Sequence, residues 1–259
     1  MHTRAQDIAE WLKERVASAG ARGIVVGLSG GIDSAVVIGL AAMAVPGRVL
    51  GVVLPCHSDP QDAADARLAA AHFGVPTIAI DLAPAFDTLL GGLRQAVATL
   101  PDGQRPVSTA DEVDIRMRVP VANVKPRLRM TSLYFVANSL NYLVAGTGNR
   151  SELTIGYFTK YGDGGVDLLP IGRMLKSEVR AIARELGVPA PIIEKPPSAG
   201  LWQGQTDETE MGFTYADLET YLTQGAEAIA PALALRIERL ARASEHKRTM
   251  PPAPDEEQP

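Results

Sequence analysis

Short apolar runs alternate with longer, helix-like stretches through most of the chain. A first helix is predicted around Ile8, Trp11, Leu12 and Val16, because their spacing places them on one helical face. The apolar runs that follow are short and rich in valine and isoleucine, which is typical of strands buried on both faces. We expect four such strands, at residues 23–28, 48–54, 75–81 and 142–146.

Helical patterns lie between and after these runs. The segment 33–44 is almost wholly apolar, residues 124–140 predict a long helix, and residues 177–187 predict a later one. Strands and helices that alternate in this way favour a parallel sheet with helices on both faces. The expected fold class is therefore a single doubly wound α/β domain over residues 1–250, followed by a disordered tail at 251–259.

Two polar stretches follow neither the strand nor the helix period. Pro101 and Pro106 argue against a helix in residues 101–120, which predict irregular structure, and residues 195–212 predict a long loop. The segment 198–211 is longer than a simple connection needs, and loops beyond about 12–15 residues are usually functional or disordered. We expect it to act as a mobile lid over bound substrates, with Leu201 and Trp202 as its apolar cover.

The composition excludes several classes of protein. At 259 residues and 46% hydrophobic content the chain can bury one full α/β core, and no apolar run approaches the ~20 residues of a membrane span. A net charge of −5 argues against nucleic acid as a main partner. The single Cys56 excludes an internal disulfide, and no secretory signal is visible. We expect a cytoplasmic protein without a membrane partner.

The segment 29–34, with the sequence SGGIDS, carries the strongest chemical signal. It joins an apolar strand to an apolar helix, and its glycines allow a tight turn with room for a ligand. The helix start offers free N–H groups and a positive dipole end, which together bind anions. Asp33 stands beside this anion site as a candidate Mg²⁺ ligand. The segment is similar to the signature of the PP-loop ATP pyrophosphatases, which cleave ATP between the α and β phosphates.

Other interpretations of this turn remain open. It could be a glycine turn that binds nothing. It also matches the G-x-S-x-G elbow of serine hydrolases, with Ser29 as nucleophile and His246 far downstream. A non-catalytic adenine-nucleotide sensor on the same sheet is a third possibility. Hydrolysis of a p-nitrophenyl ester, or ATP binding without pyrophosphate release, would favour the hydrolase or the sensor respectively.

Further polar clusters follow in a fixed order along the chain. They occur at residues 123–130, 146–152, 158–165, 195–199 and 245–248. With the SGGIDS turn they resemble the ammonia-dependent NAD⁺ synthetases, a PP-loop family, from the first helix to Arg248. FTKYGDGG at 158–165 argues against PP-loop relatives with another acceptor, such as those of GMP or argininosuccinate synthesis.

The resemblance implies a ligase that makes NAD⁺ from deamido-NAD⁺, ATP and ammonia through an acyl adenylate, releasing pyrophosphate and AMP. It implies Mg²⁺ as cofactor, held by Asp33 and Glu152. The positions implied for ATP are Ser29, Gly30, Gly31, Ile32, Asp33, Ser34, Arg127, Thr147, Lys176 and Ser198, of which Arg127 and Thr147 also face the acceptor. Those implied for deamido-NAD⁺ are Asn123, Tyr134, Lys160, Asp163, Asp167, His246 and Lys247. Asp33, Lys176 and Asp163 would act in catalysis, Asp163 by orienting ammonium or taking its proton.

The sequence departs from the family at two places. Val119 stands where members often carry Phe, and Val53 stands where some carry Arg before Leu-Pro. We therefore do not expect the contact with a substrate ring that Phe makes in other members. We also expect adenine to be recognised by a different arrangement of residues. The resemblance also implies free ammonia as nitrogen source, because the residues before the first strand form only one helix and leave no room for a glutaminase domain.

The family is dimeric, and the pattern of residues 124–140 agrees with a buried helix. Apolar and aromatic side chains lie on more than one of its faces, which favours burial on several sides. They are Leu128, Leu133, Tyr134, Phe135 and Leu140. We expect a homodimer in which Tyr134 reaches toward the deamido-NAD⁺ of the partner subunit.

Overall fold

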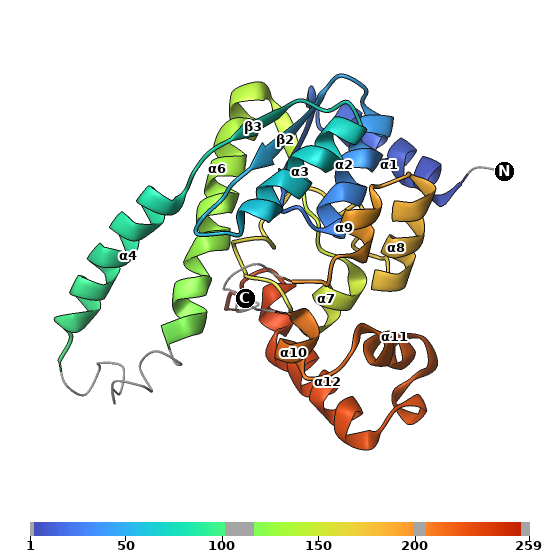
Figure 1. Ribbon diagram of the computed structural model, residues 1–259. Coiled ribbons are helices and arrows are strands. Elements are labelled where there is room, and N and C mark those ends of the chain that lie inside the picture. The colour runs from blue at the N-terminus through green and yellow to red at the C-terminus, as the bar shows by residue number, and fades with distance from the viewer. Residues whose placement is uncertain (1–2, 102–116, 199–205, 255–259) are drawn as a thin grey trace, which may run out of the picture.

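A four-stranded parallel sheet forms the centre of the molecule (Figure 1). The computed structural model describes residues 3–101, 117–198 and 206–254. The strands are β1 (Gly23–Leu28), β2 (Val49–Val53), β3 (Thr77–Ala79) and β4 (Tyr142–Ala145), in the spatial order β3-β2-β1-β4. The chain therefore adds β2 and β3 on one side of β1 and then returns to add β4 on the other.

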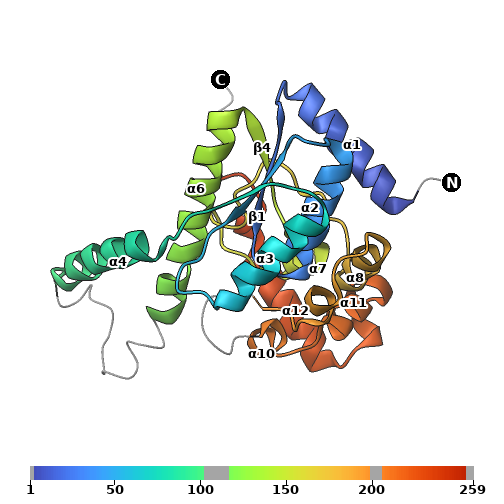
Figure 2. The ribbon, with the colours of Figure 1, turned by 45° about the horizontal axis from the view of Figure 1, so that its top comes forward.

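Helices cover both faces of this sheet (Figure 2). Those of the first half are α1 (Arg4–Ser18), α2 (Ile32–Ala44), α3 (Pro60–His72), α4 (Ala83–Ala98) and α6 (Val124–Leu140). Those of the second half are α7 (Arg150–Ile155), α8 (Lys176–Glu185), α9 (Ala190–Glu194), α10 (Asp207–Met211), α11 (Tyr215–Gln224) and α12 (Pro231–Ala243). Short 3₁₀ turns lie at Ala226–Ala228 and Glu245–Lys247.

Alternate residues of β1 point into two different cores. Ile24, Val26 and Leu28 pack with α1, α2, α3, α8 and α9, whereas Val25 packs with α6 on the opposite face. All four side chains are buried, as expected for a central strand with helices above and below. A third apolar cluster joins α7 to α10, α11 and α12 at the end of the molecule where the strands terminate.

The predicted strands and the doubly wound parallel sheet are confirmed, and so is the long helix at residues 124–140. Two predictions of irregular structure were wrong in part. Residues 117–122 are helical, and Ala122 is buried at 5% exposure, so tertiary packing selects a helix there despite Pro120. Inside the predicted loop 195–212, α10 forms because the Thr206 side chain caps it and Met211 enters the third cluster. Residues 102–116 and 199–205, with Leu201 and Trp202, lie outside the described residues.

The helix α4 extends away from the rest of the molecule beside α6 (Figure 1). Phe86 is its only buried residue, and Leu89 and Leu93 are 43% and 44% exposed. On α6, Phe135 is 74% exposed. These two helices therefore carry apolar side chains that the described part of the chain leaves exposed. Among the described helices, none is long and apolar enough to cross a bilayer.

Candidate active site

A cavity of about 500 Å³ opens at the carboxyl ends of β1 and β4. These two neighbouring strands follow different crossover directions, and ligands of open α/β sheets bind at such a switch point. The turns that follow the two strands, Ser29–Gly31 and Gly146–Gly148, both contribute to the wall, as do residues of α6, α8 and the segment after α9. The cavity therefore lies where the sequence predicted a nucleotide site.

The turn after β1 is shaped to bind an anion. Gly30 has φ +77°, and a Cβ there would lie 2.3 Å from the backbone oxygen of Asp62, so only glycine fits against α3. The Ser34 hydroxyl donates to the Gly31 carbonyl at 2.9 Å, and the Gly31 N–H donates to the Ser29 hydroxyl at 3.2 Å. No side chain caps the start of α2, which leaves its first N–H groups available to a phosphate.

The Ser29 hydroxyl lacks the surroundings of a hydrolase nucleophile. Its contacts are with Gly31 and with the Ser34 hydroxyl at 3.2 Å. The described residues that line the cavity include no histidine, and His246 lies in a 3₁₀ turn after α12. The geometry therefore favours the phosphate-binding interpretation of this turn over the serine-hydrolase one.

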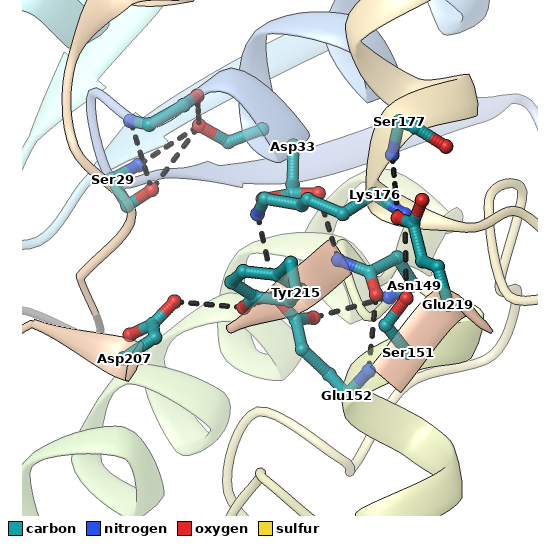
Figure 3. A network of polar contacts seen from close by, with 12 residues as sticks. Ser29, Asp33, Asn149, Ser151, Glu152, Lys176, Ser177, Asp207, Tyr215 and Glu219 are labelled. Carbon is teal, nitrogen blue, oxygen red and sulfur yellow. Dashed lines mark hydrogen bonds and ion pairs between the residues drawn. The ribbon is translucent and has the colours of Figure 1, made fainter. Parts of the chain in front are cut away.

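A buried lysine lies between two carboxylates at the bottom of the site (Figure 3). The Lys176 ammonium bonds to Asp33 Oδ2 and lies 3.5 Å from Glu152 Oε1. Lys176 is the first residue of α8 and only 2% exposed, and its ammonium lies 5.2 Å from the centre of the Tyr215 ring. Three elements that are distant in sequence, α2, α7 and α8, thus meet in one charged cluster.

Asn149 fixes the two carboxylates relative to each other. Its side-chain nitrogen donates to Asp33 Oδ1 at 3.1 Å, and its side-chain oxygen accepts from the Glu152 N–H at 3.1 Å. Glu152 Oε2 in turn accepts from the Asn149 N–H at 3.2 Å, which completes a capping box at the start of α7. Asn149 therefore bonds to both acidic residues at once and keeps Asp33 near Glu152.

Burial and charge shift the ionisation of this cluster. Burial raises the pKa of Glu152 to about 8, with the neighbouring Asp33 charge adding to the rise. Burial alone would lower the pKa of Lys176, but the Asp33 and Glu152 carboxylates outweigh it and raise that pKa above its ordinary value. The lysine is therefore a permanent cation here.

Asp33 and Glu152 fit one partial Mg²⁺ site. Mg²⁺ in phosphate-transfer sites is usually held by one or two carboxylates together with substrate phosphates. Within the described ranges, no three Asp, Glu, His or Cys side chains converge to hold a metal by themselves. The two carboxylates beside the anion-binding turn match the first arrangement and not a closed metal cage.

The opposite wall of the cavity carries a second polar group. The Thr159 hydroxyl donates to Asn123 Oδ1 at 2.7 Å, and the Thr159 N–H donates to Asp163 Oδ1 at 2.9 Å. Asn123, Thr159 and Asp163 all line the cavity. Burial raises the pKa of the Asp163 carboxyl above its ordinary value, which makes it a stronger base.

The structure brings most, but not all, of the predicted site residues to the cavity wall. The residues that line it include Ser29, Gly31, Ile32, Asp33, Thr147, Glu152, Lys176, Ser198, Asn123, Asp163 and Lys247. The Lys247 ammonium donates to the carbonyls of Gly156 and Phe158, both at 2.7 Å. Gly30 and Ser34 do not line the cavity. Gly30 packs against the backbone of Asp62, and the Ser34 hydroxyl donates to the Gly31 carbonyl within the turn.

Five predicted substrate residues do not line the cavity: Arg127, Tyr134, Lys160, Asp167 and His246. The Tyr134 hydroxyl donates to Asp167 Oδ1 at 2.9 Å, and Asp167 Oδ2 accepts from the Val144 N–H at 2.8 Å. Lys160 bonds to the His246 carbonyl, and Arg127 is exposed, donating to the Lys160 carbonyl at 3.4 Å. These residues contact one another and the backbone beside the cavity.

Several charged residues that line the cavity were not predicted from the sequence. Arg129 lies two positions after Arg127 on the same helix, so the two point in nearly opposite directions, and Arg129 is the one that faces the cavity. It donates to the Leu54 carbonyl at 3.1 Å and to the Ser58 hydroxyl at 3.2 Å, holding the loop after β2.

Asp207 and Glu210 had no signal beyond their place in an aperiodic segment, and Lys195 lies in the polar cluster 195–199 but was given no role of its own. Lys195 pairs with Asp62 Oδ1 at 2.8 Å and Asp65 Oδ2 at 2.6 Å, which anchors the chain just before Ser198. Asp207 accepts from the Tyr215 hydroxyl at 2.9 Å, and Glu210 accepts from the Tyr157 hydroxyl at 2.7 Å. The two departures noted in the sequence, Val53 and Val119, also line the cavity.

Comparison with known proteins assigns this architecture to one family. The family model described as NAD synthase matches residues 4–251. A curated protein from Carboxydothermus hydrogenoformans, named NH(3)-dependent NAD(+) synthetase, is 48% identical over 251 residues, covering 97% of this chain and 96% of its own length. Among solved structures, NMN synthetase from Francisella tularensis superposes with a TM-score of 0.85 at 36% identity, covering 97% of each chain. NAD⁺ synthetase from Burkholderia pseudomallei gives a TM-score of 0.73 at 31% identity, covering 96% of this chain and 90% of that one.

Proposed function

The chain belongs to the NAD synthase family, and we propose that it uses ATP to join ammonia to the nicotinate carboxylate of deamido-NAD⁺. One observation supports this assignment above the others. A phosphate-binding turn with two carboxylates and a lysine faces, across one cavity, a polar wall with a buried carboxylate. That arrangement suits activation of a carboxylate by ATP followed by attack of a small nucleophile.

The phosphate half of the cavity would cleave ATP between the α and β phosphates. The turn 29–31 and the start of α2 bind the β and γ phosphates through N–H groups and hydroxyls. Mg²⁺, when bound by Asp33 and Glu152, neutralises phosphate charge. Lys176 stabilises the negative charge that develops on the leaving pyrophosphate, and Ser198 contributes a hydroxyl near the same phosphates. The substrate carboxylate attacks the α phosphorus, forming an acyl adenylate.

The opposite wall would hold the acceptor and promote attack by ammonia. Asn123 and Thr159 position the nicotinate end, and Asp163 accepts a proton from the incoming nitrogen. Attack on the acyl carbon then expels AMP and leaves the amide. Enclosure matters at this stage because water would otherwise hydrolyse the adenylate. The predicted lid over residues 198–211 would supply that enclosure, which hydrogen exchange with and without substrates would test.

A product assay tests the proposal. The protein, ATP, Mg²⁺, ammonium and deamido-NAD⁺ should yield NAD⁺, AMP and pyrophosphate in equal amounts, and omission of ammonium should abolish NAD⁺. Failure to form NAD⁺ from deamido-NAD⁺, with ATP binding intact, would refute the acceptor assignment and favour the nucleotide-sensor alternative.

A second acceptor is the mononucleotide form of the same nicotinate. The similarity to a protein described as NMN synthetase is higher, in both TM-score and identity, than to the NAD⁺ synthetase from Burkholderia pseudomallei. The reacting carboxylate is the same in both acceptors, and only the adenylyl half differs. Competition between nicotinate mononucleotide and deamido-NAD⁺ at equal concentration would distinguish them through the ratio of NMN to NAD⁺ formed.

We also propose that the active form is a homodimer that covers the apolar surface of α4 and α6. Leu89, Leu93 and Phe135 are exposed on these helices and form a surface suited to a second copy. The predicted reach of Tyr134 toward the partner's substrate depends on this assembly. Cytoplasmic localisation and a single domain over residues 1–250 stay predictions, which cell fractionation and limited proteolysis would test.

A further inference from the structure

The Lys176 ammonium lies in contact with the carboxylates that the proposed function assigns to the metal. We propose that Lys176 is a resident counter-ion that excludes the divalent metal from the nucleotide-free enzyme, so that the metal binds with ATP and not before it. This inference rests on the proposed function for the identity of the metal site. Its test, however, measures metal binding to the protein alone.

The charge around the lysine requires a cation. The side chains of Asp33 and Glu152 are only 18% and 16% exposed, and the Asp207 carboxylate, 4% exposed, lies in the same cavity. Buried carboxylates are unstable without a compensating charge. Lys176 supplies that charge while the site is empty. A divalent ion added to the same carboxylates would meet a buried ammonium a few ångströms away and would be repelled.

Hydrogen bonds hold the backbone of Lys176, whereas only the contacts of its ammonium hold the end of its side chain. The Lys176 N–H donates to the Ser151 hydroxyl at 3.3 Å, and the next N–H, of Ser177, donates to Glu219 at 2.8 Å. Figure 3 shows these bonds at the start of α8, on the side away from Asp33. The four-carbon side chain has the flexibility to turn its ammonium from the carboxylates toward a phosphate in the same cavity.

The protein alone also offers the metal too few ligands. Asp33 and Glu152 are two carboxylates, and the described part of the chain has no larger cluster of metal-binding side chains. The remaining positions must come from water or from phosphate oxygens. ATP would therefore do two things at once, since its phosphates complete the coordination and attract the ammonium away from Asp33.

Metal affinity in the absence of nucleotide tests the inference. Mn²⁺ binding to the free protein, measured by electron paramagnetic resonance, should be weak in the wild type and tighter by on the order of tenfold or more in Lys176→Met. The gain should disappear in the double variant Lys176→Met/Asp33→Asn, which locates the new site. Equal Mn²⁺ affinity in the wild type and Lys176→Met would overturn the inference.

Lys247→Met is the matched control. Lys247 also lines the cavity but donates to backbone carbonyls and not to Asp33 or Glu152. Its loss removes the same charge from the same cavity and should leave Mn²⁺ affinity unchanged. A similar gain in Lys247→Met would show that general charge, and not occupation of the site, controls the metal, and would contradict the inference.

A measurement on the wild type remains informative if Lys176→Met does not fold without metal. A non-hydrolysable ATP analogue should raise the affinity of the protein for Mn²⁺ by on the order of tenfold or more above both the free protein and the free analogue. Tight Mn²⁺ binding to the nucleotide-free wild type would overturn the inference. If the nucleotide-free protein binds Mn²⁺ tightly but still makes NAD⁺, only the inference about Lys176 fails and the proposed function stands. If the free protein excludes Mn²⁺ but makes no NAD⁺, only the proposed function fails.

Discussion

The two sides of the cavity differ in how completely this single chain assembles them. On the phosphate side (the turn 29–34 with Glu152 and Lys176), side chains from α2, α7 and α8 are joined by direct bonds and nearly all face the cavity. On the acceptor side (Asn123, Thr159 and Asp163, with Tyr134, Lys160, Asp167 and His246 beside them), the last four residues bond to one another or to backbone and do not line the cavity.

The difference follows from where the two sides lie. The phosphate side is built at the ends of the paired strands β1 and β4, so the core of the sheet fixes it before any ligand binds. The acceptor side is built on loops and at the start of α6, the helix that also carries the exposed Phe135. We infer that the phosphate side is preorganised and that the acceptor side is completed by substrate and by a second subunit.

Loss of a carboxylate on the phosphate side should have the largest effect. Asp33→Asn and Glu152→Gln should each lower kcat by on the order of 10²–10³-fold, because the phosphates lose part of their metal clamp. Steady-state NAD⁺ formation at saturating ATP measures this. Glu10→Gln, at an exposed ion pair with Lys13, should behave as the wild type. Rates near the wild type in both cavity variants would contradict the metal assignment.

On the acceptor side, Asp163 lines the cavity and Asp167 does not, so their substitution should have different effects. Asp163→Asn should lower amide formation by on the order of 10–100-fold while pyrophosphate release continues, because only proton transfer from nitrogen is impaired. The expected signature is AMP formed in excess of NAD⁺. If AMP and NAD⁺ still appeared in equal amounts at the normal rate, Asp163 would have no part in amination.

Asp167→Asn is expected to act mainly on stability. Its two oxygens accept from Tyr134 and from the backbone of Val144, and an amide can replace only one of these acceptors, at a cost of about 1 kcal/mol. Urea unfolding and the KM for deamido-NAD⁺ should be measured together. A KM raised by more than about tenfold, with unchanged stability, would place Asp167 in the substrate site and reverse its assignment here.

The phosphate side should also make the stability of the free protein dependent on pH. The pKa of Glu152 is about 8 in the folded protein against an ordinary value of 4.5, so the folded state holds this proton more tightly. Its contribution to stability is complete below pH 4.5 and is lost as the pH rises through 8. Over that window the slope is up to about 1.4 kcal/mol per pH unit. Urea unfolding without metal should show this slope, and Glu152→Gln should remove it.

A substitution of the exposed Phe135 on α6 should have the smallest effect on the stability of the monomer. Phe135→Glu should leave the monomer folded but shift sedimentation from dimer to monomer, because a charge cannot be buried against a second copy. Leu235→Glu, at a residue 67% exposed on α12, is the matched control and should leave assembly unchanged. Dimers in both variants would show that α6 is not at the subunit contact.

The sequence predicted the regular part of the fold because the signal there is local. The strands at 23–28 and 142–146 are apolar on both faces. The six residues of the SGGIDS turn, which include Asp33, are enough to predict a phosphate-binding site. The missed elements depend on distant contacts. The helix α10 exists because Met211 reaches a cluster formed by α7, α11 and α12.

The candidate site shows the same division. Ser29, Asp33 and Lys176 could be named from motifs, and the structure places them together. Tyr215, which supports Lys176 and Asp207, carries no motif because its role comes from the packing of α11 against α7. The sequence analysis assigned Arg127 to the site, whereas Arg129 is the residue that lines the cavity. The sequence alone does not show which face of a helix lies against the cavity.

An isotope experiment tests most directly whether this cavity couples cleavage of ATP to amide formation. Deamido-NAD⁺ labelled with ¹⁸O in its carboxylate should be converted with ATP and ammonium, and the released AMP and pyrophosphate analysed by mass spectrometry. If the carboxylate attacks the α phosphorus, one ¹⁸O atom must appear in AMP and none in pyrophosphate. Release of that oxygen to water, or its appearance in pyrophosphate or inorganic phosphate in place of AMP, would contradict the account.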